Sequence, residues 1–351
     1  MKQMKKSIDK KTIFRKIMQS LPAASAAIAF VIYGTTFLPF SADRMKSSVA
    51  LRESVSYYEI LSGGKPLVYC RCLGDSCLPE GLSPTAGQEV MTKSYATACW
   101  VNRYPLFPSC PGLLMTAVND SAEVKAETLA NRDIRQTIKR TADRLAERLK
   151  NLENSADETN YYLSVHNVND DGYNVMAEYS EQIKEKISTA AAMLTTLRSI
   201  QDKSQTEIRR VSRHTLLYIN ASGDTVRTAC RMLTPDHGQP LRLMQTADKE
   251  KPDGASAIYL HTWLSPVPDA GDTVFVASIT GCSLHGNTAP AVTPKVFAGT
   301  ATGCCGHDLP PLLAPDGSPV FSRWGIPAGI SFGGIIINPA ETGFALKRLL
   351  P

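Results

Sequence analysis

Apolar and polar residues follow two different patterns along this chain, and the change of pattern divides it into three stretches. From about residue 49 to 115, short apolar runs such as SVSYYEIL and PLVYCRCL are separated by clusters of Gly, Pro and Ser. The same pattern returns from residue 211 to 351. Short strands joined by frequent turns predict a mainly β fold built from sandwiches or barrels.

The stretch from residue 121 to 211 contains no proline and carries apolar residues at helical spacing. One apolar stripe comprises Ile134, Ile138, Leu145, Leu149 and Leu152, and the other comprises Ile183, Ile187, Ala190, Leu194 and Leu197. The second stripe alternates gaps of four and three residues, which is the pattern of a coiled coil. Between the stripes, Asn-Asp-Asp-Gly would break a helix, so we predict an antiparallel helical hairpin.

An uncharged segment from residue 17 to 42 follows a basic N-terminal tail, residues 1–16, which holds seven Lys or Arg residues and one Asp. A transmembrane helix needs about 20 apolar residues, and this segment is long enough. The basic tail predicts a cytoplasmic N-terminus and an extracytoplasmic C-terminal domain, which would be periplasmic in a bacterium. A cleaved signal peptide stays open as the alternative, because Ala-Ala-Ser-Ala-Ala resembles a cleavage region.

The net charge bears on the possible partners, and the cysteines bear on disulfides and metal binding. The formal charge of +5 comes largely from the N-terminal tail, so composition gives no argument for a nucleic-acid partner. All nine cysteines follow the uncharged segment, where an oxidising compartment would permit disulfides. Cys70, Cys72 and Cys77 have the spacing of half a zinc site, but no second half follows. We therefore predict disulfides or buried thiols, with no metal and no other cofactor.

Two C-terminal segments carry a resemblance to a known family. Residues 316–334, DGSPVFSRWGIPAGISFGG, resemble the segment around the nucleophile of trypsin-like serine proteases, where G-D-S-G-S-P leads into an apolar strand. Residues 268–281, PDAGDTVFVASITG, are similar to a strand and turn of that family's second barrel. The resemblance implies two antiparallel β-barrels, formed by residues 49–115 and 211–351, with the hairpin inserted between strands of the first.

The same resemblance assigns the catalytic positions. An alignment without gaps puts Asp316 at the nucleophile position, followed by Gly317 in a tight turn. It puts Cys99, in the segment YATACWV, at the position of the histidine base. The acid falls, depending on the register, on Asp253, Ala255 or Ser256. An Asp and a Cys do not form a nucleophile–base pair for peptide cleavage, so the resemblance implies a degenerate family member.

Three functions therefore stay open. The first is a membrane-anchored pseudoprotease that binds a peptide or an envelope protein and uses the hairpin as an interaction arm. The second is an active trypsin-like peptidase with its triad elsewhere, or a Cys/His peptidase that uses His307 with Cys304 or Cys305. The third is a structural envelope protein that forms homo-oligomers through the hairpin.

The predicted anchor is testable by cell fractionation. The full-length protein should pellet with membranes and resist carbonate extraction, because a helix of about 20 apolar residues stays in the bilayer. A soluble mature protein that begins near residue 27 would instead demonstrate a cleaved signal peptide.

Overall fold

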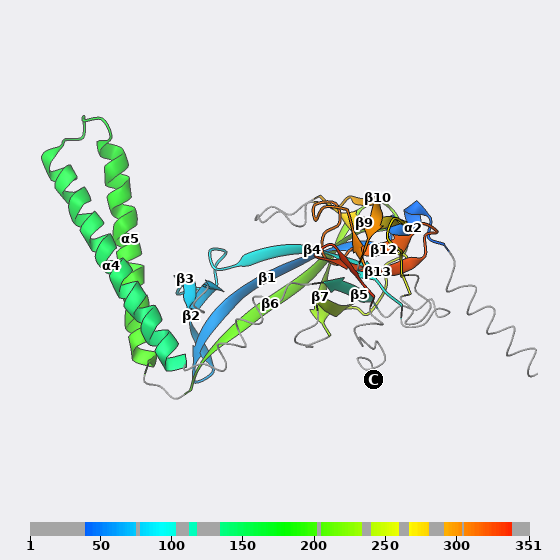
Figure 1. Ribbon diagram of the computed structural model, residues 1–351. Coiled ribbons are helices and arrows are strands. Elements are labelled where there is room, and N and C mark those ends of the chain that lie inside the picture. Colours follow the sequence, from blue (N-terminus) through cyan, green and yellow to red (C-terminus); the bar gives the residue numbers. More distant parts are fainter. Residues whose placement is uncertain are drawn as a thin grey trace, which may run out of the picture.

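The computed structural model describes residues 39–74, 78–102, 112–117, 134–201, 205–233, 240–259, 267–280, 291–303 and 305–338. Figure 1 shows two β-barrels, a long ribbon of strands that leaves the first barrel, and a helical hairpin at the far end of the ribbon. The first barrel contains β1 (Val49–Ser62), β4 (Thr92–Trp100), β5 (Leu113–Ala117), β6 (Thr206–Ile219), β7 (Thr225–Met232) and β8 (Leu241–Thr246). The second contains β9 (Thr273–Ile279), β10 (Pro294–Thr302), β11 (Gly306–His307), β12 (Pro319–Ser322), β13 (Pro327–Phe332) and β14 (Ile335–Ile337). Two further strands, β2 (Lys65–Leu73) and β3 (Pro79–Ser83), extend the sheet beside β1.

Both barrels have the same strand order. The first runs β1-β4-β5-β8-β7-β6 and closes because β6 returns to pair with β1, and the second runs β9-β10-β11-β14-β13-β12. In each barrel the first three strands are followed by the last three in reverse order. The predicted pair of antiparallel barrels is confirmed. The hairpin enters between the third and fourth strands of the first barrel.

A continuous apolar core joins the two barrels. Leu51 of β1 and Met115 of β5 pack in one cluster with Phe321 of β12 and Ile330 of β13. A separate cluster comprises Ala50, Ala98, Trp100, Leu114, Leu216 and Met244, all from strands of the first barrel. Neighbouring residues of a strand thus contribute to different clusters, as the period of two in a β-strand requires.

The chain enters the barrels through a short segment at residues 39–47. Ser41 caps helix α2 (Ala42–Lys46). The Phe40 N–H donates to the Gly325 carbonyl at 2.9 Å, and the rings of Phe40 and Phe321 lie 5.4 Å apart. The last residues of the predicted membrane segment, 39–42, therefore belong to the barrel domain. Residues 17–38 lie outside the described residues, and none of the described helices is both long and apolar enough to span a bilayer.

The ribbon is formed by β1 and β6, which stay paired from Leu51↔Leu217 to Ser62↔Thr206. The nearly buried Glu59 supports it by pairing with Arg209 of β6 at 2.7 Å, and Glu53, closer to the start of β1, pairs with Arg227 of β7. The distal half of β1 also pairs with β2. A two-stranded ribbon is marginal alone, so these added pairs matter for its stability.

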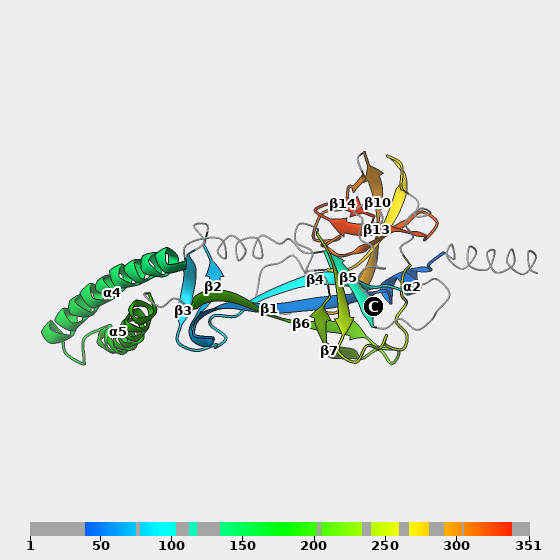
Figure 2. The same ribbon diagram turned by 90° about the horizontal axis from the view of Figure 1, so that it is seen from below.

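Helices α4 (Ile134–Val165) and α5 (Tyr173–Ile200) form the predicted hairpin (Figures 1 and 2). Its base packs on Ile60 of β1 and on Val68 of the adjoining β2. The buried helical residues of this base core are Ile138, Ala142, Leu145, Ala190, Met193, Leu194, Leu197 and Ile200. Both predicted apolar stripes thus contribute to the core, whereas the supercoil that their spacing predicts stays a prediction.

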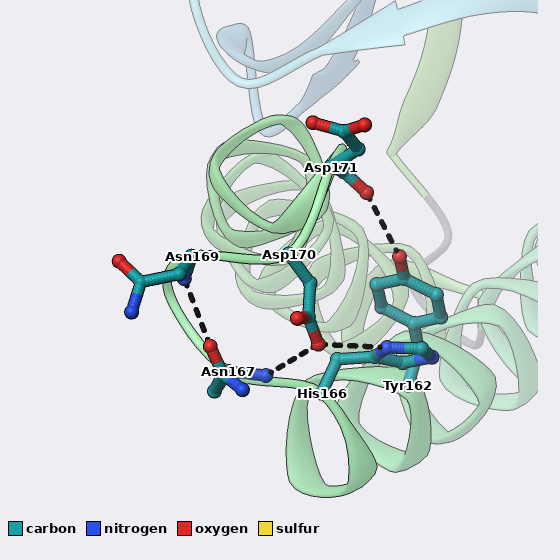
Figure 3. Close-up of polar contacts among 6 residues, drawn as sticks. All are labelled: Tyr162, His166, Asn167, Asn169, Asp170 and Asp171. Atoms are coloured by element: carbon teal, nitrogen blue, oxygen red, sulfur yellow. Dashed lines mark hydrogen bonds and ion pairs between the residues drawn. The ribbon is translucent and has the colours of Figure 1, made fainter.

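Short polar contacts close the turn between the two helices (Figure 3). Asp170 Oδ2 accepts a hydrogen bond from the Asn167 N–H at 3.0 Å and lies 3.1 Å from His166 Nδ1. The bond from the Asn167 N–H, followed by the contact with His166, lowers the pKa of Asp170. Gly172 then begins the second helix with a φ of 87°, a conformation that favours glycine. The predicted helix break at Asn-Asp-Asp-Gly is confirmed.

Leu197 is fully buried where the hairpin meets the ribbon. Leu197→Ala should cost about 2–5 kcal/mol of packing free energy there. Amide hydrogen exchange should therefore accelerate in α4, α5 and the distal ribbon, while β9 and β13 keep their protection. Thr195→Ala, at an exposed position of the same helix, is the control. Equal loss of protection in both barrels would contradict this separation.

Candidate functional site

The segment that resembles a nucleophile turn lies between β11 and β12 and is bound to β13 by backbone hydrogen bonds. The Gly317 N–H donates to the Ser331 carbonyl at 2.9 Å, and the Ser331 N–H donates to the Ser318 carbonyl at 2.8 Å. Ser318 is fully buried, and its hydroxyl donates to the Pro315 carbonyl at 2.6 Å. The carboxylate of Asp316 accepts from the Gly333 N–H at 2.8 Å. These contacts hold the turn against β13 within the second barrel.

Gly317 presses this turn against the first barrel. Its φ is 88°, and a Cβ there would collide with the Thr97 carbonyl oxygen of β4. The same Cβ would lie 2.8 Å from Thr116 Oγ1 and 3.0 Å from the Ala117 nitrogen, at the end of β5. The turn thus lies at the junction of the two barrels, where a trypsin-like protease has its catalytic centre.

An oxyanion hole in this family uses the backbone N–H of the nucleophile and that of the residue two positions before it. The second donor would be Ala314. Its N–H donates to the Pro310 carbonyl at 3.0 Å, within a turn that also bonds the Leu313 N–H to Pro310 at 2.9 Å. Ala314 is only 3% exposed. In this conformation the Ala314 N–H is already occupied by the Pro310 carbonyl.

Cys99 lies in β4, paired in register with Val49 of β1 and Met115 of β5. It is fully buried in the core between the barrels, together with Phe321 and Ile330. Burial raises the pKa of its thiol. Cys99 is thus a neutral apolar group of the core, a setting that suits neither a base nor a nucleophile.

The strand that ends beside Gly317 is β5, and the sequence did not predict that these two segments are neighbours. This strand reads LLMTA, and the chain continues with Val118 and Asn119, which lie outside the described residues. The family's strand followed by T-A-A-H matches Thr116-Ala117-Val118-Asn119 as well as it matches the segment around Cys99. In this second register, Asn119 occupies the position of the base.

Asp253, the predicted acid, is exposed in the loop after β8. It lines a pocket of about 210 Å³ with Tyr218, Asp248 and Glu250. Further along this loop, Ser256 receives a hydrogen bond from the Ser47 hydroxyl at 2.9 Å. The surroundings of Asp253 are acidic and open to solvent, and its assignment to a triad stays a prediction.

His307 contacts a serine close to the turn. Its Nε2 lies 2.8 Å from Ser331 Oγ, and its Nδ1 is buried with no hydrogen-bond partner among the described groups. Burial lowers the pKa of His307, so the imidazole is neutral at pH 7. Ser331 is fully buried and has no exposed surface for a substrate to reach. The geometry is that of a structural hydrogen bond inside the second barrel.

A second Cys–His pair lies across β6 and β7, where His214 faces Cys230. Burial, with further contributions from Arg52 and Arg210, lowers the pKa of His214 to about 4. Burial raises the pKa of Cys230 to about 12. A thiolate–imidazolium pair requires the opposite shifts, so this pair is not suited to nucleophilic catalysis.

The remaining cysteines give no support to the predicted disulfides. No disulfide joins any two of the five described cysteines, which are Cys70, Cys72, Cys99, Cys230 and Cys305. Cys70 is buried in β2, whereas Cys72 is exposed, and Cys77 and Cys304 lie outside the described residues. In the part of the chain that the structure describes, no three His, Cys, Asp or Glu side chains form a group that could hold a metal ion.

No protein-family model and no curated protein matches this sequence. Among solved structures, the chain is similar to Deg5, at 10% identity over 80% of both chains, with a TM-score of 0.30. It is similar to the MamO protease domain from Magnetospirillum magneticum in its apo form, at 14% identity over 42% of this chain and 79% of that one, with a TM-score of 0.27. The HtrA-type protease AlgW with a decapeptide gives 11% identity over 85% of this chain and 62% of that one, with a TM-score of 0.30. TM-scores this low say nothing about the site, which is defined here by strand order and local geometry alone.

The contact of Gly317 with the first barrel is testable by substitution. Gly317→Ala should destabilise the protein by several kcal/mol, because left-handed strain of about 1–2 kcal/mol adds to a collision with backbone. Gly271→Ala is the matched control, since Gly271 has a φ of 93° with nothing near its would-be Cβ. Thermal unfolding should show a much larger loss for Gly317→Ala. Equal losses would mean that the turn does not press on β4 and β5.

Proposed function

We propose that this protein is a degenerate member of the trypsin-like protease family, without hydrolytic activity, that binds a peptide or protein partner. The strand order of both barrels and the Asp-Gly-Ser-Pro turn between them support the family assignment. The observation that carries the lack of activity is the occupied Ala314 N–H, a donor that an oxyanion hole would need.

The nucleophile position adds a second obstacle. Asp316 presents a carboxylate, which is a poor nucleophile toward peptide bonds and already accepts the Gly333 N–H. Its negative charge would also lie next to the position where a tetrahedral intermediate develops negative charge. Both effects oppose acyl transfer.

Neither register for the base supplies an imidazole. Cys99 is a buried thiol, and Asn119 has an amide that accepts no proton at neutral pH. The proposal therefore does not depend on which register is correct. Loss of one triad member alone costs about 10⁴–10⁶ in rate, and the residual catalysis normally comes from the oxyanion hole and substrate binding. The occupied Ala314 N–H opposes that residual activity as well.

The binding part of the proposal is supported by the hairpin. It extends away from the barrels, and near its end Tyr161 and Val175 are 71% and 70% exposed. Exposed apolar side chains on a projecting element are typical of an interaction surface. If the predicted N-terminal anchor is retained, the hairpin would hold a partner at a distance from the membrane.

The purified full-length protein in mild detergent should cleave neither casein nor ester substrates above the buffer rate, and fluorophosphonates should not label it. Asp316→Ser should stay unlabelled, since no imidazole would deprotonate the new hydroxyl. Asp316→Ser combined with Asn119→His should give faint labelling, and Asp316→Ser combined with Cys99→His should give none. The comparison of these two double variants tests the second register.

Robust hydrolysis by the wild-type protein would contradict the proposal. Loss of that hydrolysis in Ser331→Ala, with Ser322→Ala as a control in the neighbouring strand, would establish a serine peptidase that uses the His307–Ser331 contact. Loss in Cys305→Ala would point to a cysteine peptidase instead.

A further inference from the structure

The two ends of the hairpin carry opposite charge. Residues 157–181, at the tip, contain no Lys or Arg and six acidic residues, which are Asp157, Glu158, Asp170, Asp171, Glu178 and Glu181. Residues 135–150, at the base, contain two acidic residues and six basic ones, which are Arg135, Lys139, Arg140, Arg144, Arg148 and Lys150. At the base of the other helix, residues 184–200 add three basic residues against one acidic residue. The hairpin is therefore acidic at the tip and basic at the base.

The acidic tip also exposes large apolar side chains. Tyr161 and Val165 on α4 are 71% and 58% exposed, and Val175 and Tyr179 on α5 are 70% and 43% exposed. Each pair has the i,i+4 spacing that brings two side chains together on one helix face. These faces are uncovered in the single chain, unlike the apolar residues of the base, which pack on the ribbon.

The base offers a groove next to its basic residues. This groove has a volume of about 690 Å³ and opens between the two helices and β3. Its helical wall includes Leu145, Leu152 and Met193. The charged side chains of this wall are Arg144, Arg148, Lys186 and one carboxylate, Glu185, whereas Glu80 and Glu89 line the side formed by residues 79–89. An apolar side chain with acidic neighbours fits such a wall, and the tip presents that combination.

From these observations we propose that the hairpin pairs with the hairpin of a second copy of this chain, antiparallel, so that each acidic tip lies on the partner's basic base. The pairing rests on the proposed use of the hairpin as an interaction arm, and it does not depend on the absence of hydrolysis.

The dimensions of the helices permit this arrangement. A helix of 32 residues is about 48 Å long, and a second of 28 residues is about 42 Å long. With contact strips about 10 Å wide, two helices offer about 900 Å² per partner, which exceeds the roughly 800 Å² of a standard interface.

Charge favours a second copy over other occupants. An anionic membrane surface would repel the acidic tip. A basic protein would neutralise the tip and leave the base without a counterpart, whereas an antiparallel copy neutralises both ends in one interface. The same charges oppose the parallel arrangement, which would bring like charges together.

Sedimentation equilibrium of the full-length protein in mild detergent tests the pairing. The wild-type protein should dimerise, and added salt should weaken the dimer. Charge reversal at the base, Arg144→Glu with Arg148→Glu, should weaken dimerisation at least tenfold, and so should Asp157→Lys with Glu158→Lys at the tip. The chain with all four substitutions should dimerise within about threefold of wild type, because complementarity is restored. Lys295→Glu with Arg323→Glu, on the second barrel, is the matched control and should change nothing.

A wild-type protein that stays monomeric up to about 100 μM would overturn the pairing, and so would a dimer that is indifferent to both reversals. Failure of the fourfold variant to dimerise, with helix content intact by circular dichroism, would also overturn it. Hydrolysis is assayed on the same samples. An inactive monomer would refute the pairing alone, and an active dimer would refute only the proposed absence of hydrolysis.

Discussion

Pairing of β1 with β6 is the constraint on which the rest of this structure depends. It closes the first barrel, and its continuation beyond the barrel forms the ribbon that carries the hairpin. Because side chains alternate between the two faces of a strand, a slip by one residue would move every side chain of the ribbon to the other face. Ile60 would then leave the core beneath the helices, and Glu59 would lose Arg209. The register between β1 and β6, which starts inside the first barrel, therefore fixes where the hairpin lies.

The turn at Asp316 connects the two barrels, at the place where a trypsin-like protease has its catalytic centre. The Ala314 N–H is bonded to Pro310 and the Gly317 N–H to Ser331, and Gly317 lies directly against β4 and β5. An active site must leave such donors unoccupied until a substrate arrives. Here the turn holds the two barrels in contact through its backbone.

Local periodicity made the barrels and the hairpin predictable, because strand and helix periods are visible in short windows. The apolar run that begins at Val49 is buried in the structure, and the spacing of Ile183, Ala190 and Leu194 corresponds to a buried helix face. The site was harder to predict, since two strands carry the sequence Thr-Ala and nothing local distinguishes them. Gly317 approaches both strands, at Thr97 within β4 and at Ala117 where β5 ends, and only this tertiary contact shows that β5 is the strand that ends beside the turn. The pairing of β1 with β6 joins residues about 150 positions apart, as in the Glu59–Arg209 contact, and no local pattern encodes it.

Residue-resolved amide hydrogen exchange at Ala314 and Gly317 tests the central claim, that the turn is closed by its own backbone, most directly. Both amides are donors in hydrogen bonds of 3.0 and 2.9 Å within the second barrel. The account predicts that they exchange as slowly as the Ser331 amide of β13, which donates to the same turn. Exchange of Ala314 at the rate of an open loop amide would contradict it, because that donor would then be available to an oxyanion.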